Sequence, residues 1–209
     1  GLICIPSGNH DMDRLARSLS PEEMKIAFAF LLSMPGAPFI YYGDEIGLRY
    51  VEGLTSVEGG YGRTGSRSPM QWDKTPNAGF SSAPAEKLYV KQDDAPDRPD
   101  AASQCADETS LRSEVKRLIA LRMAHPALQS KGTVSFLADN YPLAYVRSSA
   151  EESILVIINP SATPAVLSAE ELCALNKKLL YTVGGTVKEN ADHTLQVDGG
   201  TAAFIALTK

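Results

Sequence analysis

The sequence predicts an α/β section followed by an all-β section, and three observations support this. Two short apolar runs, 2–5 and 38–42, each lead into a polar cluster, and a strongly apolar helical segment lies between them. This strand, helix, strand order predicts a right-handed parallel βαβ unit. After residue 132 the hydrophobic period changes to two, with short apolar runs between turn residues, which predicts an antiparallel β-sandwich.

Polar side chains follow each of the two expected strands. Leu2-Ile3-Cys4-Ile5 leads into Gly8-Asn9-His10-Asp11, and the second run leads into Gly43-Asp44-Glu45. Polar residues at strand ends are typical of the catalytic face of a parallel barrel. Between the strands, Ser20-Pro21-Glu22-Glu23 combines an N-cap, a proline at the first helical position and a capping-box glutamate. A helix is therefore expected to begin there, and Pro35-Gly36 is expected to follow its end.

A long segment rich in Gly and Pro, residues 46–106, comes next. Disorder is one interpretation, but apolar residues that disordered segments lack are spread through it: Tyr61, Met70, Trp72, Phe80 and Tyr89. Long loops inside compact domains usually border an active site. We therefore expect an ordered active-site loop.

The next segment, 110–124, is expected to be a helix, because apolar residues recur at helical spacing. Lys131-Gly132 marks the expected boundary between a first domain, 1–132, and a second domain, 133–209. Six strands are expected in the second domain: 133–137, 143–147, 153–159, 178–183, 194–197 and 202–207.

Composition argues against several classes of protein. A net charge of -5 without a basic run disfavours a nucleic-acid partner, and no apolar run approaches the ~18 residues of a membrane span. The three cysteines are widely spaced and odd in number, so neither a disulfide framework nor a zinc site is expected, and Cys4 and Cys173 are expected to be buried thiols. Unpaired cysteines and no visible signal peptide favour a cytoplasmic location. The chain opens directly in a strand of interior type, which suggests a fragment.

These motifs, in this order, resemble the α-amylase family of glycoside hydrolases. Asn9-His10-Asp11 resembles the motif that ends strand 7 of the family's barrel, and 38–45 resembles strand 8. The segment 63–80, with Ser-Arg-Ser-Pro-Met-Gln-Trp-Asp, is similar to the following loop in the oligo-1,6-glucosidase, α-glucosidase and trehalose synthase branch. The last eighty residues or so resemble the family's C-terminal domain. The resemblance implies the last two βα units of a (β/α)8 TIM barrel followed by an antiparallel β-sandwich.

The family's reaction is retaining cleavage or transfer at an α-glucosidic bond. The resemblance implies that Asp11 holds the 2- and 3-hydroxyls of the distorted sugar and favours the developing positive charge. It implies that His10 hydrogen-bonds the same sugar. Arg63 and Arg67 would reach the subsite of the non-reducing glucose, since a guanidinium fork suits fixed hydroxyl and carboxylate partners.

Other residues have competing interpretations. Arg14 either faces the substrate entrance or pairs with Asp13 or Glu23. For Asp44-Glu45, a hydrogen-bonded pair that braces the strand end is favoured over catalysis. Trp72 is expected to be the loop's hydrophobic anchor, with stacking on a sugar as the alternative. No metal or cofactor is expected, because no cluster has metal-ligand spacing.

The family's nucleophile and general acid belong to strands 4 and 5, which the 209 residues lack. The resemblance thus implies the C-terminal portion of a hydrolase or transglycosylase acting on short α-gluco-oligosaccharides, inactive alone. It would depend on the missing barrel part or self-associate, with no nucleic-acid or membrane partner. Two alternatives are a non-catalytic relative, such as a transporter partner, and an isolated carbohydrate-binding module. Retention of His10, Asp11 and Arg63 argues against the non-catalytic relative.

Overall fold

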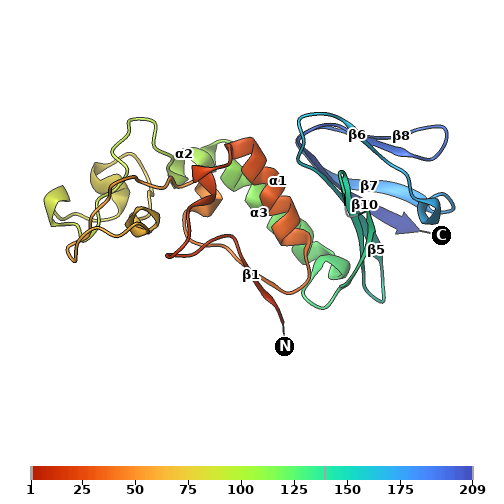
Figure 1. Cartoon of the computed structure of the whole chain (residues 1–209), viewed down its shortest axis with the longest axis horizontal. Helices are drawn as coiled ribbons and strands as arrows, with labels where there is room; N and C mark the ends of the chain where they lie inside the picture. Colours follow the sequence, from red (N-terminus) through yellow and green to blue (C-terminus); the bar gives the residue numbers. More distant parts are fainter. Residues whose placement is uncertain (1, 139, 209) are drawn as a thin grey trace. The chain divides into compact units, whose positions relative to one another are not determined.

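The computed structural model describes residues 2–138 and 140–208 (Figure 1). The chain divides into two compact units. The first comprises 1–5, 25–38 and 117–209, and the second comprises 6–24 and 39–116. Because the first unit takes residues from both sides of position 132, the expected domain boundary there stays a prediction.

The first two strands form a short parallel pair. β1 (Cys4–Pro6) lies beside β2 (Ala37–Phe39) in a two-stranded sheet. Ala37 N donates to Ile3 O, and Ser7 N donates to Phe39 O, each at 2.8 Å. Later residues of β1 therefore pair with later residues of β2, which is the pattern of two parallel strands. The expected bounds of 2–5 and 38–42 were wrong by one to three residues, because the pairing ends where the chain turns into the polar clusters.

Helix α1 (Pro21–Ser33) connects these strands and begins at the expected capping box. Ser20 N donates to Glu23 Oε2 at 2.8 Å, and Glu23 N donates to Ser20 Oγ at 3.3 Å. Hydrogen bonds from the Ser20 backbone and hydroxyl lower the pKa of Glu23. Both carboxylates of the first turn also lie near the positive end of the helix dipole. The predicted helix is confirmed.

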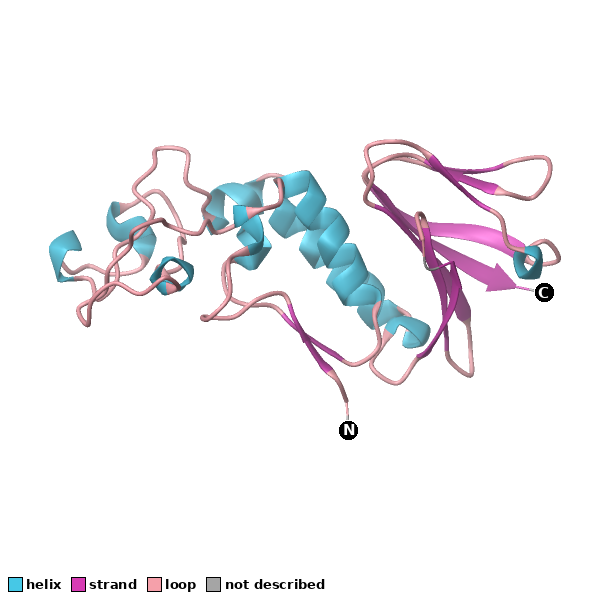
Figure 2. Cartoon of the chain, in the orientation of Figure 1, coloured by secondary structure: helices cyan, strands magenta, loops and turns pink. Residues whose placement is uncertain are grey.

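The segment after β2 folds as short helices joined by loops (Figure 2). It contains η2 (Asp44–Ile46), η3 (Thr64–Arg67), η4 (Pro76–Gly79), η5 (Ala85–Lys87) and α2 (Ala101–Ala106). A small core holds it together, made of Ile46, Leu48, Met70 and Ala101. An ordered segment is therefore confirmed, but α2 was missed. Its signal was present, since Asp100 caps it by accepting from Ser103 N at 2.7 Å.

Helix α3 (Leu111–Ala124) matches the predicted helix, and β strands follow. One antiparallel sheet has the order β3-β4-β5-β10-β7, and a second has the order β6-β9-β8. The first contains β3 (Thr133–Ala138), β4 (Leu143–Ser148), β5 (Ser153–Asn159), β7 (Asn176–Val183) and β10 (Thr201–Thr208). The second contains β6 (Ala165–Leu167), β8 (Val187–Glu189) and β9 (Leu195–Val197). Three further short helices are η1 (Leu15–Arg17), η6 (Pro126–Leu128) and η7 (Glu170–Leu172).

The antiparallel sheets expected after residue 132 are confirmed, while β6 and β8 were missed because each is only three residues long. A shared core joins the two sheets, including Leu155, Ile157, Leu167, Leu195, Val197 and Ile205. Strand β5 is buried on both faces, so it appears in the sequence as a continuous apolar run.

Two buried arginines bind the carbonyl groups at the end of α1. Arg122 donates from Nη1 to Leu32 O at 2.7 Å and Met34 O at 2.8 Å, and from Nη2 to Gly36 O at 2.8 Å. Arg147 donates to Ser33 O and to carbonyls of the segment before β3. The last carbonyls of a helix lack intrahelical partners, so these guanidinium groups satisfy them. Burial and the neighbouring Arg122 lower the pKa of Arg147 to about 10, which leaves it charged at neutral pH.

The cysteines differ from expectation. Cys4, Cys105 and Cys173 are all free and exposed, so the prediction of buried thiols for Cys4 and Cys173 was wrong. Cys4 lies on a strand that exposes alternate residues, and Cys173 follows η7 on its exposed side. No helix in the described ranges is long and apolar enough to cross a bilayer.

Candidate functional site

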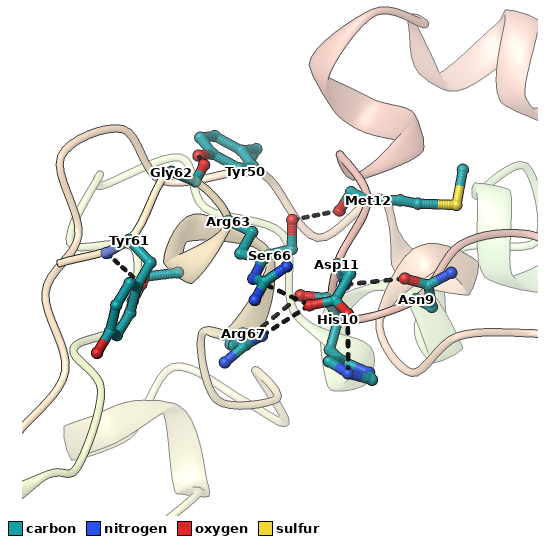
Figure 3. Close-up of polar contacts among 11 residues, drawn as sticks. Asn9, His10, Asp11, Met12, Tyr50, Tyr61, Gly62, Arg63, Ser66 and Arg67 are labelled. Atoms are coloured by element: carbon teal, nitrogen blue, oxygen red, sulfur yellow. Dashed lines mark hydrogen bonds and ion pairs between the residues drawn. The ribbon is translucent and has the colours of Figure 1, made fainter. Parts of the chain in front are cut away.

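Asp11 lies in a tight turn that follows β1 (Figure 3). Asp11 N donates to Asn9 Oδ1 at 2.8 Å, and Met12 N donates to Asn9 O at 3.2 Å. Asn9 therefore forms the turn with both its side chain and its backbone, as Asn commonly does. The Asp11 side chain is 45% exposed, so its carboxylate is accessible to a ligand.

Two arginines from the loop after β2 reach this carboxylate (Figure 3). Arg67 Nη2 lies 2.8 Å from Asp11 Oδ1, and Arg63 Nε lies 3.1 Å from the same oxygen. Arg67 also donates from Nε to His10 O at 3.0 Å. The structure thus brings together four of the expected site residues, although they come from segments more than fifty positions apart in the chain.

His10 approaches the other oxygen of the carboxylate. Its Nε2 lies 3.4 Å from Asp11 Oδ2, and its side chain is 65% exposed. Both arginines contact Oδ1, so the two oxygens differ in their surroundings. An exposed, oriented carboxylate with an imidazole beside it can accept hydrogen bonds from neighbouring hydroxyl groups of a ligand.

Hydrogen bonds from side-chain hydroxyls to backbone carbonyls position η3, the short helix that carries Arg67. Ser66 Oγ donates to Met12 O, and Tyr41 OH donates to Ser66 O at 3.2 Å. Gly65 permits a close approach, because a Cβ there would lie 2.3 Å from Val51 O. The site therefore depends on η3 being held against the turn that contains Asp11.

Arg14 does not join this cluster. Its side chain is buried, with Nη1 3.1 Å from Asp44 Oδ1 and a further hydrogen bond to Tyr42 O. Its guanidinium carbon lies 4.2 Å from the ring centre of Tyr41 and 4.6 Å from that of Tyr42. Neither expected arrangement of Arg14 is observed, because the two rings and a carboxylate enclose it.

Asp44 has the structural role at the strand end that the sequence favoured. The residues that bond to it are Ser7 and Arg14. Ser7 Oγ donates to Asp44 Oδ2 at 2.7 Å, and Arg14 holds the other oxygen. Asp44 thereby connects the residues after β1 to those after β2. Burial raises the pKa of the neighbouring Glu45, and Asp44 adds to this effect.

Trp72 is not the buried anchor that the sequence suggested. The residue is 52% exposed, whereas Met70 and Gln71 of the same motif are buried. Gln71 Nε2 donates to Pro99 O, and Ala102 N donates to Trp72 O at 2.8 Å. The backbone of Trp72 is therefore fixed while its ring faces solvent. Within residues 2–138 and 140–208, no three His, Cys, Asp or Glu side chains are grouped to hold a metal ion.

Several known proteins are similar to this chain in sequence or in fold. The family model described as alpha amylase, catalytic domain matches residues 4–131. Trehalose synthase/amylase TreS of Mycobacterium tuberculosis is 36% identical over 162 residues, 72% of this chain and 26% of the relative. A probable alpha-glucosidase of Rhizobium meliloti is 30% identical over 225 residues, 99% of this chain and 39% of the relative.

Two further likenesses concern a transporter heavy chain and a solved structure. The amino acid transporter heavy chain SLC3A1 of Rattus norvegicus is 29% identical over 176 residues, 78% of this chain and 24% of the relative. The crystal structure of the trehalulose synthase MutB from Pseudomonas mesoacidophila has a TM-score of 0.82 at 24% identity, covering 100% of this chain and 43% of that one. The chain thus spans about a quarter to two fifths of the length of these proteins.

Proposed function

Since this chain belongs to the α-amylase family of glycoside hydrolases, we propose that it is the C-terminal portion of a retaining enzyme that hydrolyses or transglycosylates α-glucosidic bonds. Its substrates would be short α-gluco-oligosaccharides, in keeping with the likeness to a probable alpha-glucosidase and a trehalose synthase. The observation that carries the proposal is the convergence of His10, Arg63 and Arg67 on the Asp11 carboxylate.

This arrangement suits a reaction that passes through an oxocarbenium-like transition state. Asp11 would accept hydrogen bonds from adjacent hydroxyls of one sugar, and its negative charge would favour the positive charge that develops on that ring. His10 would hydrogen-bond the same sugar. Arg63 and Arg67 would hold Asp11 in place before substrate arrives, so that little reorganisation is needed during the reaction.

The nucleophile and general acid would come from the remainder of a longer parent. We assign β1 and β2 to strands 7 and 8 of a (β/α)8 barrel, residues 1–132 to the barrel and 133–209 to the β-sandwich. Two βα units cannot close a barrel, so the isolated chain would be inactive and would associate with the missing part or with itself. Sedimentation of the isolated chain tests this point, and a monomer at high concentration would count against it. A cytoplasmic location also stays a prediction.

A non-catalytic role is the second candidate, and the likeness to the transporter heavy chain favours it. A scaffold has no chemical need for a carboxylate held by two arginines and a histidine. The clustering of Asp11, Arg63 and Arg67 therefore supports the enzyme over the scaffold. An isolated sugar-binding module is a further alternative, which would show as sugar binding without dependence on Asp11.

The proposal is tested by Asp11→Asn in the full-length parent, assayed on p-nitrophenyl α-glucoside. Loss of the charge should lower kcat by about 10²-fold or more, with an unchanged unfolding midpoint. Asp13→Asn is the matched control, because Asp13 is an exposed aspartate two positions away whose partner is Arg17. Turnover unchanged by Asp11→Asn would overturn the assignment. Turnover by the isolated 209-residue chain would return Asp44 and Glu45 as catalytic candidates.

A further inference from the structure

One buried carboxylate holds both ends of the segment that carries Asp11. Ser7, four positions before Asp11, donates from Oγ to Asp44 Oδ2 at 2.7 Å. Arg14, three positions after Asp11, donates from Nη1 to Asp44 Oδ1 at 3.1 Å. Each oxygen of Asp44 therefore binds a different end of the segment 7–14, and the exposed Asp11 lies between the two ends.

A ligand has no access to Asp44. Its side chain is 1% exposed and that of Arg14 is 0% exposed, whereas the side chain of Asp11 is 45% exposed. Solvent and salt screen a buried ion pair much less than a surface pair. Asp44 can therefore influence a reaction at Asp11 only through the segment that it holds.

The start of this segment packs closely against Asp44. A Cβ added at the buried Gly8 would lie 3.1 Å from Asp44 Oδ2, so a residue without a side chain allows the backbone to pass here. Ser7 Oγ also accepts from Tyr41 N at 2.9 Å. Ser7 is thus fixed both to the side chain of Asp44 and to the backbone that follows β2.

The end of the segment is fixed by the charge of Arg14. Its Nη1 also donates to Tyr42 O, and its guanidinium carbon lies over the rings of Tyr41 and Tyr42. Its Nε and Nη2 are buried without a hydrogen-bond partner among the residues that the structure describes. Asp44 therefore supplies the carboxylate that balances this buried charge, and removing it would leave the charge without compensation.

The contacts of the Asp11 side chain are, in contrast, exposed to solvent. The side chains of Arg67, Arg63 and His10 are 35%, 58% and 65% exposed. Ion pairs at such positions contribute little to holding a fixed geometry. A displacement of about 1 Å at a catalytic group can cost about 10²-fold in rate. The buried anchor of the segment 7–14 should therefore matter for turnover.

We propose that Asp44 is a positioning residue for the reaction assigned to Asp11. Its carboxylate fixes both ends of the segment 7–14 and so sets where the Asp11 carboxylate meets the sugar. The inference rests on the proposed function and adds to it a residue that never touches the substrate. Since Asp11 would act mainly on the transition state, loss of the anchor should lower kcat and change KM little.

A double-mutant cycle in the full-length parent tests this connection. Asp44→Asn alone should lower kcat on p-nitrophenyl α-glucoside by about ten- to a hundredfold, with KM within about threefold of the parent. In the Asp11→Asn background, the same substitution should lower kcat by less than about threefold, because the residue through which Asp44 acts has already been removed. A structural role alone would give the same factor in both backgrounds.

Asp100→Asn is the matched control. Asp100 is a carboxylate of similar burial, 3% exposed, in the same unit. It caps α2 by accepting from Ser103 N at 2.7 Å and Ser103 Oγ at 2.8 Å, and it does not contact the segment 7–14. Asparagine is an equally good cap, so this substitution should leave kcat within about twofold of the parent.

A second variant covers the case in which Asp44→Asn does not fold. Ser7→Ala leaves the ion pair between Arg14 and Asp44 in place and removes the hydrogen bonds of Ser7 Oγ to Asp44 and Tyr41 N. It should lower kcat by about three- to tenfold in the parent, and by less in the Asp11→Asn background. Circular dichroism and the melting temperature establish that each variant is folded under the assay conditions.

The outcomes separate this inference from the proposed function. Equal factors in the two backgrounds, or a rise in KM at constant kcat, would overturn the positioning role. A kcat that neither Asp44→Asn nor Ser7→Ala lowers would do the same. If Asp11→Asn lowers kcat while the cycle is additive, only this inference fails. If Asp11→Asn leaves turnover unchanged, the proposed function fails and this inference fails with it.

Discussion

Arg67 makes two hydrogen bonds to the turn that contains Asp11, from Nη2 to the Asp11 carboxylate at 2.8 Å and from Nε to the carbonyl of the preceding residue, His10 O, at 3.0 Å. The guanidinium thus holds both the side chain and the backbone of the turn. A lysine has no planar fork and could make only one of these contacts in the same orientation. Because Arg67 belongs to the loop after β2, this loop helps to orient Asp11.

Replacing Arg67 by Ala in the full-length parent should lower kcat/KM by about ten- to a hundredfold, because a charge-assisted contact to the carboxylate is lost. The two side chains are 35% and 45% exposed, so solvent screening keeps the effect at the lower end. Arg63→Ala should have the smaller effect, since Arg63 is 58% exposed and makes the longer contact. The measurement is steady-state kinetics on p-nitrophenyl α-glucoside.

Arg17→Ala is the matched control for this experiment. Arg17 is a surface arginine of similar exposure, 39%, whose partners are Asp13 and Glu52. Its loss should leave kcat/KM within about twofold of the parent. If Arg17→Ala and Arg67→Ala reduced activity equally, the role of Arg67 in orienting Asp11 would be wrong.

Gly43 is required where β2 turns into η2. Its φ is +85°, and a Cβ there would lie 2.7 Å from Leu48 Cδ2. Gly43→Ala should lower the free energy of unfolding by about 2 kcal/mol or more, through backbone strain and overpacking against a buried leucine. Gly62→Ala is the control, because nothing lies within 4 Å of its added Cβ and its φ is not in the left-handed region. Urea unfolding of the two variants measures the difference, and equal midpoints would contradict it.

Arg122 should contribute strongly to stability. Arg122→Met removes three hydrogen bonds and leaves Leu32 O, Met34 O and Gly36 O to find other partners, so we expect a loss of about 2–4 kcal/mol. Lys116→Ala, an exposed cation on the same helix, should change stability by less than about 0.5 kcal/mol. Thermal unfolding measures the melting temperatures of the two variants and of the unchanged protein. An unaltered melting temperature for Arg122→Met would refute the capping role.

Glu45 should make stability fall as pH rises. Burial, with a smaller effect of Asp44, raises its pKa above the ordinary 4.5, while hydrogen bonds from its own and Gly43's backbone and the charge of Arg14 oppose this. From 4.5 up through the folded-state pKa the native state binds more protons than the unfolded state, so stability decreases with pH in that window. Glu45→Gln removes the buried charge. It should raise the melting temperature more at about pH 7 than at about pH 4, where the carboxyl is mostly protonated in both states.

Glu86→Gln serves as the control for that pH dependence, because Glu86 is exposed. It should leave the pH profile of the melting temperature unchanged. A Glu45→Gln variant whose gain is the same at both pH values would show that the carboxylate carries no penalty from burial.

Local sequence patterns predicted well where the longer helices and strands form, but they predicted the first and last residues of the strands poorly. The capping box at Ser20 and the apolar spacing of 111–119 were sufficient for α1 and α3, because helix signals are local. Strands of three residues, such as β6 and β8, carry too little pattern to stand out. The solvent exposure of single residues was predicted least well. Cys4, Cys173 and Trp72 were expected to be buried, and all three are exposed.

The sequence by itself determined which candidate site residues the chain contains and in what order they occur along it. Asn9-His10-Asp11, the run 63–80 and the apolar period of two after residue 132 each have a local signature of residue types and spacing. Those signatures were enough to indicate the family and the candidate residues His10, Asp11, Arg63 and Arg67.

Only the tertiary structure decided which of these residues meet. Arg14 is three positions from Asp11 yet is buried against Asp44, whereas Arg67 is 56 positions away and contacts the carboxylate. The tertiary structure also places Trp72, Tyr89 and Glu45 in the lining of one pocket. The physical reason is that local spacing constrains neighbours along one element, while contacts between distant segments depend on how loops pack and which polar groups burial forces to pair.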